Sequence, residues 1–266
     1  MIGNIAGERN PMTDFPRSIT ENNHVAPAPR RVRGVAGGDV VFDTTRALYV
    51  WEWPHYPCYY VPLADVRSGA LTPDGDPAST PQGDAQSQRL HAGGLERPAA
   101  ARLILASALP GLRDTVRFEW SALDGWFEED EEIFVHPRSP YTRVDALRST
   151  RSVRVERDGV VLAASASPVM VYETGLPTRY YLDQRNVRFE HLVPSKTRTE
   201  CPYKGRVSGY WSASINGRIH PDLAWMYSFP TRQLLPIAGL VAFLNERVDI
   251  FIDGQAQARP KTHMST

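Results

Sequence analysis

An internal repeat is the sequence feature that most constrains how this chain of 266 residues folds. Residues 30–66 align without gaps with residues 151–187 at a constant offset of 121, and ten of these 37 positions are identical. At an offset of 125, Val116 and Phe118 also match Val241 and Phe243. Self-similarity at a fixed spacing marks a structural unit that recurs along the chain. The sequence therefore predicts two copies of one domain. The identical pairs of the first alignment include Val32 and Val153, Gly38 and Gly159, Glu52 and Glu173, Tyr59 and Tyr180, and Tyr60 and Tyr181.

The repeat divides the chain into five segments. We expect a first copy over residues 30–140, a linker over 141–150 and a second copy over 151–254. Residues 1–28 and 255–266 are polar and lack hydrophobic periodicity, which predicts a disordered or loosely draped arm and a similar tail.

Short strands separated by turn residues predict that each copy is mainly β. In the second copy, alternating residues flank Asp158-Gly159 and Asn216-Gly217, and both dipeptides favour two-residue hairpin turns. Residues 97–109 are the best helix candidate, because Pro98 suits a first helical turn and apolar residues follow it. The expected fold is two tandem small β-rich domains, each a barrel, sandwich or folded multi-sheet unit, with little helix.

Charge and cysteine content exclude several classes of protein. Thirty basic residues balance thirty acidic ones, which argues against broad attraction to nucleic acid or to an anionic membrane. The longest nearly apolar run, residues 234–244, is too short to span a bilayer. Two cysteines, Cys58 and Cys201, cannot form a disulfide framework, so a reducing cytoplasm is expected. The oligomeric state is left open.

The most distinctive segment is Thr199-Glu-Cys-Pro-Tyr-Lys-Gly205 in the second copy, which holds one of only three lysines in the chain. Together with Tyr180-Tyr181, Ala224-Trp225 and Ile237-Ala-Gly-Leu-Val-Ala-Phe243, this segment resembles the pattern of domain-of-unknown-function family 427, which is also labelled nucleotidyltransferase-like. The first copy resembles the same domain more weakly.

The resemblance implies small β-rich domains, often in tandem and similar to the β-tent group, with no established reaction, substrate or cofactor. The nucleotidyltransferase label finds no support in the residues, because no Gly-Ser followed by paired Asp carboxylates is present to hold catalytic Mg²⁺. Many β-tent domains carry zinc on two Cys-x-x-Cys pairs. This chain has no such pair, so structural zinc is not expected and no metal ligands are assigned.

Cys201 and Lys204 are the candidate catalytic residues. An ammonium beside a thiol favours the thiolate, which is the better nucleophile. Gly205 would relieve the backbone of a tight turn that brings both groups together. In the alternative interpretation, Cys201 is a small buried residue and Lys204 closes the turn or holds an anionic group.

Aromatic residues crowd the second copy. Tyr181, Tyr203, Trp211 and Trp225 are candidate ligand-binding residues, since aromatic walls suit a flat or cationic ring. The same side chains equally suit the core of a small β domain.

Glu173 is a further candidate ligand-binding residue, and it recurs as Glu52 in the first copy. A carboxylate present in both copies also fits a structural role. Glu52 would then pair with Arg33 and Glu173 with Arg154, or Glu173 with Arg179 across a turn.

A proline-stiffened segment, His136-Pro-Arg-Ser-Pro-Tyr141, follows the acidic residues 128–132 between the copies. We expect Glu128 and Asp130 on a solvated face. His136, Arg138 and Tyr141 supply groups that an anion or carboxylate site needs. The alternative is a rigid strap with Arg–Glu ion pairs.

These observations lead to the hypothesis of a protein that binds a small molecule, either in an aromatic-lined pocket of the second copy or at the junction. One alternative is an enzyme of small-molecule metabolism that uses Cys201 and Lys204, or His136 and Glu132 as acid and base. Another alternative is a non-catalytic interaction module.

Overall fold

The chain folds into two units. The computed structural model describes residues 20–262, so most of the predicted arm lies outside the described residues. Among these, the N-terminal unit comprises residues 20–141 and 199–206, and the C-terminal unit comprises residues 142–198 and 207–262. The segment 199–206 thus belongs to the N-terminal unit although it lies within the second copy of the sequence.

The N-terminal unit consists of short antiparallel strands. Its strands are β1 (Val25–Pro27), β2 (Val32–Ala36), β3 (Asp39–Thr44), β4 (Leu48–Val50), β5 (Cys58–Pro62), β6 (Leu71–Pro73), β7 (Ala78–Thr80), β8 (Gly83–Ala92), β9 (Leu95–Ala106), β10 (Thr115–Phe118), β11 (Gly125–Glu128), β12 (Glu131–Ile133), β19 (Glu200–Cys201) and β20 (Gly205–Arg206). Its two 3₁₀ helices are η1 (Leu63–Asp65) and η2 (Trp120–Ala122). The larger sheet has the order β1-β4-β5-β10-β9-β8-β6, with β7 paired to β8, and the smaller sheet has the order β12-β11-β2-β3.

The C-terminal unit is built in the same way. Its strands are β13 (Val144–Arg148), β14 (Val153–Arg157), β15 (Val160–Ser165), β16 (Val169–Glu173), β17 (Arg179–Leu182), β18 (Leu192–Ser195), β21 (Gly209–Ile215), β22 (Arg218–Met226), β23 (Val241–Phe243), β24 (Asp249–Ile252) and β25 (Gln255–Ala256). Its 3₁₀ helices are η3 (Gln184–Asn186), η4 (Phe189–His191) and η5 (Arg232–Ile237). The sheet orders are β13-β16-β17-β23-β22-β21-β18 and β15-β14-β24-β25.

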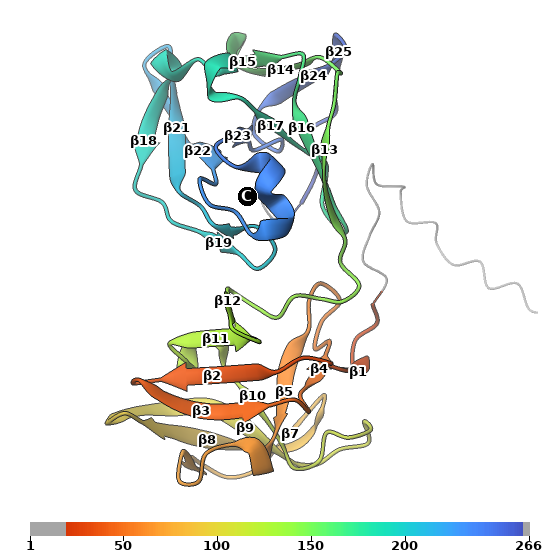
Figure 1. Ribbon diagram of the computed structural model, residues 1–266, viewed down its shortest axis with the longest axis vertical. Helices are drawn as coiled ribbons and strands as arrows, with labels where there is room; N and C mark the ends of the chain where they lie inside the picture. The colour runs from red at the N-terminus through yellow and green to blue at the C-terminus, as the bar shows by residue number, and fades with distance from the viewer. Residues whose placement is uncertain (1–19, 263–266) are drawn as a thin grey trace, which may run out of the picture. The chain divides into compact units, whose positions relative to one another are not determined.

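The two units share one topology, because each position in the sheet order of one unit has its counterpart in the other (Figure 1). An isolated bridge joins Phe42 to Val66 in the N-terminal unit and Ala163 to Val187 in the C-terminal unit, and the two bridges are 121 residues apart. The predicted pair of tandem β-rich domains is confirmed, and the repeat extends beyond its identical residues to the whole strand order.

Hairpin turns lie where the sequence predicts them. Asp158 and Gly159 have φ of 49° and 78°, and Asn216 and Gly217 have φ of 48° and 76°. Two successive left-handed residues form the turn whose twist matches paired antiparallel strands. These turns join β14 to β15 and β21 to β22.

The helix predicted for residues 97–109 is wrong, since these residues form most of β9, which pairs with β8 and β10. Gly93 and Gly94, with φ of 54° and 78°, reverse the chain directly after β8 and place it beside that strand. Pro98 falls within a register shift of the β8–β9 pair, where a residue without an N–H costs no ladder hydrogen bond.

Both predicted boundaries of the second copy also shift. β13 lies within the expected linker 141–150 and pairs with β16, and it corresponds to β1 at the end of the expected arm. β25 begins the expected tail and pairs with β24, and beyond it Gln257 N donates to Ile250 O at 2.8 Å. Edge strands of a few residues carry too little periodicity for sequence detection.

Each unit has a main core between its two sheets and a smaller apolar cluster on the other face of the larger sheet. In the C-terminal unit, η5 covers this second face with Leu234 and Ile237, which pack against Val171 and Tyr181 (Figure 1). The corresponding cluster of the N-terminal unit contains Tyr60. The main cores draw on both sheets of their units, and their largest members include Phe42, Tyr49, Trp51, Leu90, Leu162, Leu182, Leu223 and Phe243.

Candidate functional site

The segment with the rare lysine folds as a two-stranded hairpin. β19 and β20 pair through Cys201 and Gly205, and Gly205 has a φ of 96°, a conformation that favours glycine. Lys204 Nζ lies 3.9 Å from Cys201 Sγ, and Lys204 is only 6% exposed. The structure therefore brings the two predicted catalytic side chains together on one turn.

This hairpin packs on the strap, which we define as residues 134–141. The Tyr203 hydroxyl accepts a hydrogen bond from the Ser139 N–H at 2.9 Å. The Arg206 guanidinium lies 4.6 Å from the centre of the Phe134 ring, and it donates to Glu132 at 3.1 Å. Two candidate sites that lie more than 60 residues apart in the sequence thus form one region of the N-terminal unit.

Four rings gather beside the hairpin, and we call Trp53, Tyr56, His136 and Tyr203 the ring cluster. Tyr56 and His136 stack with their centroids 3.8 Å apart and their planes 4° apart. Tyr203 meets His136 edge-on at 6.2 Å, and Trp53 meets Tyr56 edge-on at 4.6 Å. Trp53 is 42% exposed. The cluster therefore presents one exposed indole beside three half-buried rings.

Trp53 and Tyr56 are functional candidates that sequence reasoning missed. They come from the loop between β4 and β5, which contains Trp53-Pro-His-Tyr-Pro57. The corresponding loop of the second copy, residues 174–178 between β16 and β17, has no aromatic residue. The signal was available in the sequence, since aromatic residues beside prolines in one copy and not in the other mark a departure from the repeat.

A buried carboxylate anchors the strap. Glu128 is almost fully buried, and its carboxylate accepts from Arg30 at 2.6 Å, Arg138 at 3.0 Å and Tyr59 at 2.7 Å. The solvated position expected for Glu128 is wrong, because two guanidiniums and a hydroxyl compensate its charge inside the protein. Burial, followed by the Glu128 charge, raises the pKa of Tyr59, so this phenol remains a donor. Asp130 is exposed and pairs with Arg33.

The end of the strap is held by aromatic contacts. Tyr141 stacks on Trp51 at 5.1 Å, and its hydroxyl lies 3.0 Å from His24 Nε2. Arg138 and Tyr141, both predicted to bind ligand, therefore attach the strap to the rest of the N-terminal unit. Arg138 makes the Arg–Glu ion pair that the alternative interpretation of this segment expects.

The aromatic residues of the C-terminal unit do not line one pocket. Tyr181 is fully buried, and its hydroxyl accepts from Trp225 Nε1 at 3.2 Å in the cluster beneath η5. Trp211 packs instead with Phe189 against the main core. Because neighbouring residues of a strand point to opposite faces of the sheet, Trp211 cannot share a wall with Trp225, its near neighbour across the β21–β22 pair.

Glu52 and Arg154 have other partners in the structure than the expected ones. Glu52 accepts from Arg117 at 3.0 Å rather than from Arg33. Arg154 pairs with Glu156 at 3.1 Å. Glu173 is buried at the end of β16.

Arg179, the third suggested partner of a glutamate, makes two hydrogen bonds to Glu246, of 2.6 and 2.8 Å. Sequence spacing suggested only local partners, whereas strand pairing brings distant residues together.

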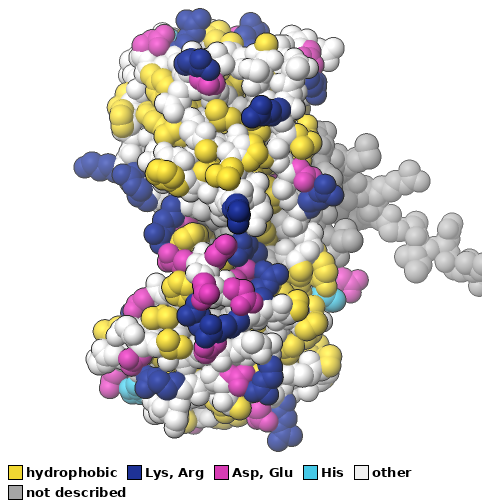
Figure 2. All heavy atoms as spheres, in the orientation of Figure 1, with side chains coloured by type: hydrophobic (Ala, Val, Ile, Leu, Met, Phe, Trp, Pro, Cys, Tyr) yellow, Lys and Arg dark blue, Asp and Glu magenta, His cyan; other side chains and the backbone are white. Residues whose placement is uncertain are grey.

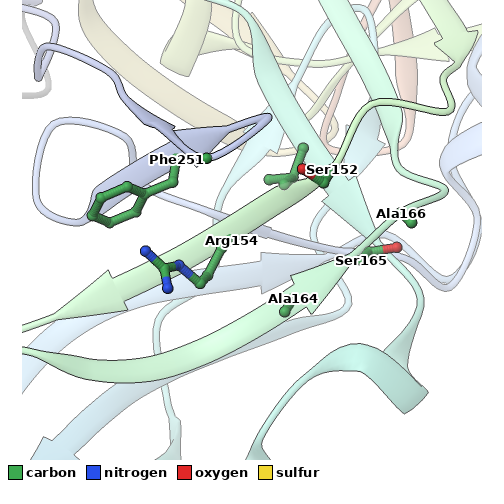
Figure 3. Close-up of a pocket in the computed structure, with 8 residues that line it drawn as sticks. Ser152, Arg154, Ala164, Ser165, Ala166 and Phe251 are labelled. Atoms are coloured by element: carbon green, nitrogen blue, oxygen red, sulfur yellow. The ribbon is translucent and has the colours of Figure 1, made fainter.

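An open groove lies on the smaller sheet of the C-terminal unit. Arg154 lies 4.3 Å from the centre of the Phe251 ring, and Ser152 and Ser165 line the same groove (Figure 3). The Arg154 charge is already balanced by Glu156.

Charge distribution, potential metal ligands and helix length are further properties of the described residues. On the face shown in Figure 2, basic and acidic side chains are interspersed rather than gathered into a field of one sign. Within residues 20–262, no three His, Cys, Asp or Glu side chains are arranged to hold a metal ion. No helix in the same part of the chain has the length and the apolar composition needed to cross a membrane.

The fold and the repeated topology define a protein made of two tandem copies of one small antiparallel β domain. A family model described as domain of unknown function (DUF427) matches residues 24–129 and 145–254, and the chain belongs to this family. The two matches begin 121 residues apart, next to β1 and β13. The nucleotidyltransferase-like label of the family is only a name. None of the curated proteins compared with the chain matches it.

Proposed function

We propose that the protein binds a small molecule with a flat ring, and that this ligand lies against the ring cluster of the N-terminal unit. The observation that carries the proposal is the convergence of the hairpin and the strap on stacked Tyr56 and His136. Ligand sites combine an apolar or aromatic wall with a few placed polar groups. Trp53 supplies the exposed wall, and the Tyr203 hydroxyl and the His136 ring supply polar groups beside it.

The geometry suits stacking more than it suits charge recognition. The Trp53 indole is exposed beside Tyr56, so a planar ligand can cover it and remove both surfaces from water. A cationic ring would gain further attraction from the π faces. Arg206, an exposed cation of the hairpin, already pairs with Glu132 and Glu200.

A thermal-shift experiment on the full chain tests this proposal. The probes are indole, benzamidine and adenosine, which represent a neutral, a cationic and a nucleoside ring. A ligand at 100 times its Kd stabilises the native state by about 2.7 kcal/mol, because it binds the folded chain alone. We expect at least one probe to raise Tm, and we expect Trp53→Leu to abolish that rise.

Phe229→Leu is the matched control, since Phe229 is an exposed aromatic residue of the C-terminal unit. This variant should respond to the probes as the wild type does. The proposal fails if none of the three rings raises Tm, or if Trp53→Leu and Phe229→Leu respond alike.

Covalent catalysis by Cys201 is the second candidate function, and the 3.9 Å distance between Lys204 Nζ and Cys201 Sγ favours it. Alkylation by iodoacetamide, followed by peptide mapping, compares Cys201 in the native and the unfolded chain. A nucleophilic Cys201 should react faster in the native protein, because the thiolate is the reactive form. Cys58 serves as the internal reference. A Cys201 protected by folding would remove this candidate.

A further inference from the structure

Four charged side chains of the N-terminal unit form a second cluster. We call Glu52, Arg102, Arg117 and Glu119 the arginine cluster. Arg117 Nε donates to Glu52 at 3.0 Å, and Arg117 also pairs with Glu119. Arg102 lies 3.4 Å from Glu52. Burial by itself raises the pKa of Glu52, but Arg117 and Arg102 outweigh burial and lower it, so Glu52 is ionised.

The repeat shows that this cluster replaces an aromatic surface. In the strand register, Arg117 of β10 lies opposite Arg102 of β9. The corresponding positions of β23 and β22 hold Ala242 and Trp225. In the C-terminal unit, 14 residues separate these two strands and include η5, which covers that face. In the N-terminal unit only eight residues separate them. The equivalent face therefore stays partly open, with the side chains of Arg102 and Glu119 30% and 44% exposed.

The Arg102 guanidinium makes longer hydrogen bonds to Glu52 than Arg117 does. Its Nη2 makes only long contacts with Glu52, of 3.4 and 3.5 Å. Among the described residues, its Nε is buried and has no hydrogen-bond acceptor, and Glu119 Oε1 is 3.9 Å away. A guanidinium can bind a carboxylate through its Nε–Nη edge, which donates two parallel hydrogen bonds. A buried donor without an acceptor costs stability, so an acceptor that reaches it is favoured.

Charge counting shows which acceptor fits. Two guanidiniums and the half-buried Glu52 carboxylate leave one positive charge, which Glu119 balances from the exposed side of the cluster. We propose that Arg102 binds the carboxylate of a monocarboxylate ligand, which takes the place of Glu119. A single negative charge keeps the cluster neutral. A phosphate dianion would leave an excess negative charge at a partly buried position, which is unfavourable.

NMR spectroscopy of the full chain tests this proposal with acetate as the probe, at ionic strength matched with chloride. The Arg102 Nε–H resonance should shift downfield as acetate binds, because it gains an acceptor. Glu119→Gln should bind acetate about tenfold more tightly, since the competing carboxylate is removed while a side chain of similar size remains. Inorganic phosphate should bind more weakly than acetate.

Arg102→Lys keeps the positive charge but loses the planar fork, so it should lose most of the acetate affinity. Arg67→Lys is the matched control, because Arg67 is an exposed arginine of the same unit that pairs with Asp39. The proposal is overturned if the Arg102 resonance does not move, if Glu119→Gln binds no better than the wild type, or if phosphate binds as tightly as acetate. Acetate carries no ring, so these results do not depend on the ring cluster.

Discussion

Single residues decide how the two copies differ in chemistry. The register that places Trp225 beside Ala242 in the C-terminal unit places Arg102 beside Arg117 in the N-terminal unit. Position 58 is a cysteine in the first copy, and its counterpart at offset 121 is Arg179, which pairs with Glu246. Identical backbone positions thus carry an ion cluster in one unit and an aromatic core in the other.

The Cys58 thiol predicts how the stability of the fold depends on pH. Burial, reinforced by the Glu52 charge, raises the pKa of the Cys58 thiol to about 11. In the unfolded chain a thiol has a pKa of about 8.5. Above that pH the unfolded state gains a favourable ionisation that the folded state lacks. The stability contributed by the neutral thiol is therefore complete below about pH 8.5 and is lost as pH rises toward 11, by roughly 3 kcal/mol in total.

Urea unfolding between pH 8 and pH 11 under reducing conditions measures this loss. The free energy of unfolding should fall more steeply with pH in the wild type than in Cys58→Ala. Ionising tyrosines contribute equally to both proteins and cancel in the comparison. Equal slopes for the two proteins would contradict a neutral, buried thiol at position 58.

At the scale of elements, the hairpin β19–β20 departs most from the repeat. It lies between β18 and β21 in the sequence, and β7 holds the corresponding place between β6 and β8. Yet the hairpin packs with the strap of the N-terminal unit through Tyr203 and Arg206. Its folding should therefore depend on the N-terminal unit.

Amide hydrogen exchange tests this dependence. Leu182→Ala creates a cavity in the core of the C-terminal unit and should cost about 3 kcal/mol. Amides of β14 and β24 should then exchange faster, while those of Cys201 and Gly205 keep their protection, because local opening follows packed units. Leu112→Ala, at a fully buried leucine of the N-terminal unit, is the control and should expose the hairpin amides. The reverse pattern would show that the hairpin follows the C-terminal unit.

The whole molecule is a duplication in which one topology carries two different surfaces. Both units bury a main core between two antiparallel sheets, and both place further groups on the other face of the larger sheet. The C-terminal unit seals that face with η5 and buries Tyr181. The N-terminal unit leaves it partly open and adds the ring cluster. Both sites that we propose for ligands therefore lie in the N-terminal unit.

Some of this could be predicted from the sequence alone. Ten identities at one offset, and the Asp158-Gly159 and Asn216-Gly217 turns, determined the tandem β architecture, because turn geometry and side-chain alternation are local properties. β9 escaped prediction because its Pro98 and apolar run also suit a helix, and pairing with β8 and β10 outweighed that propensity.

The sequence also determined which residues are unusual, and so it identified Cys201, Lys204 and His136. Only the tertiary structure decided their setting. It placed the hairpin against the strap and buried Glu128 between Arg30 and Arg138. It also placed Trp211 and Trp225 on opposite faces of the sheet. The physical reason is that these contacts join residues far apart in the chain, and their energies depend on packing and charge balance rather than on local sequence.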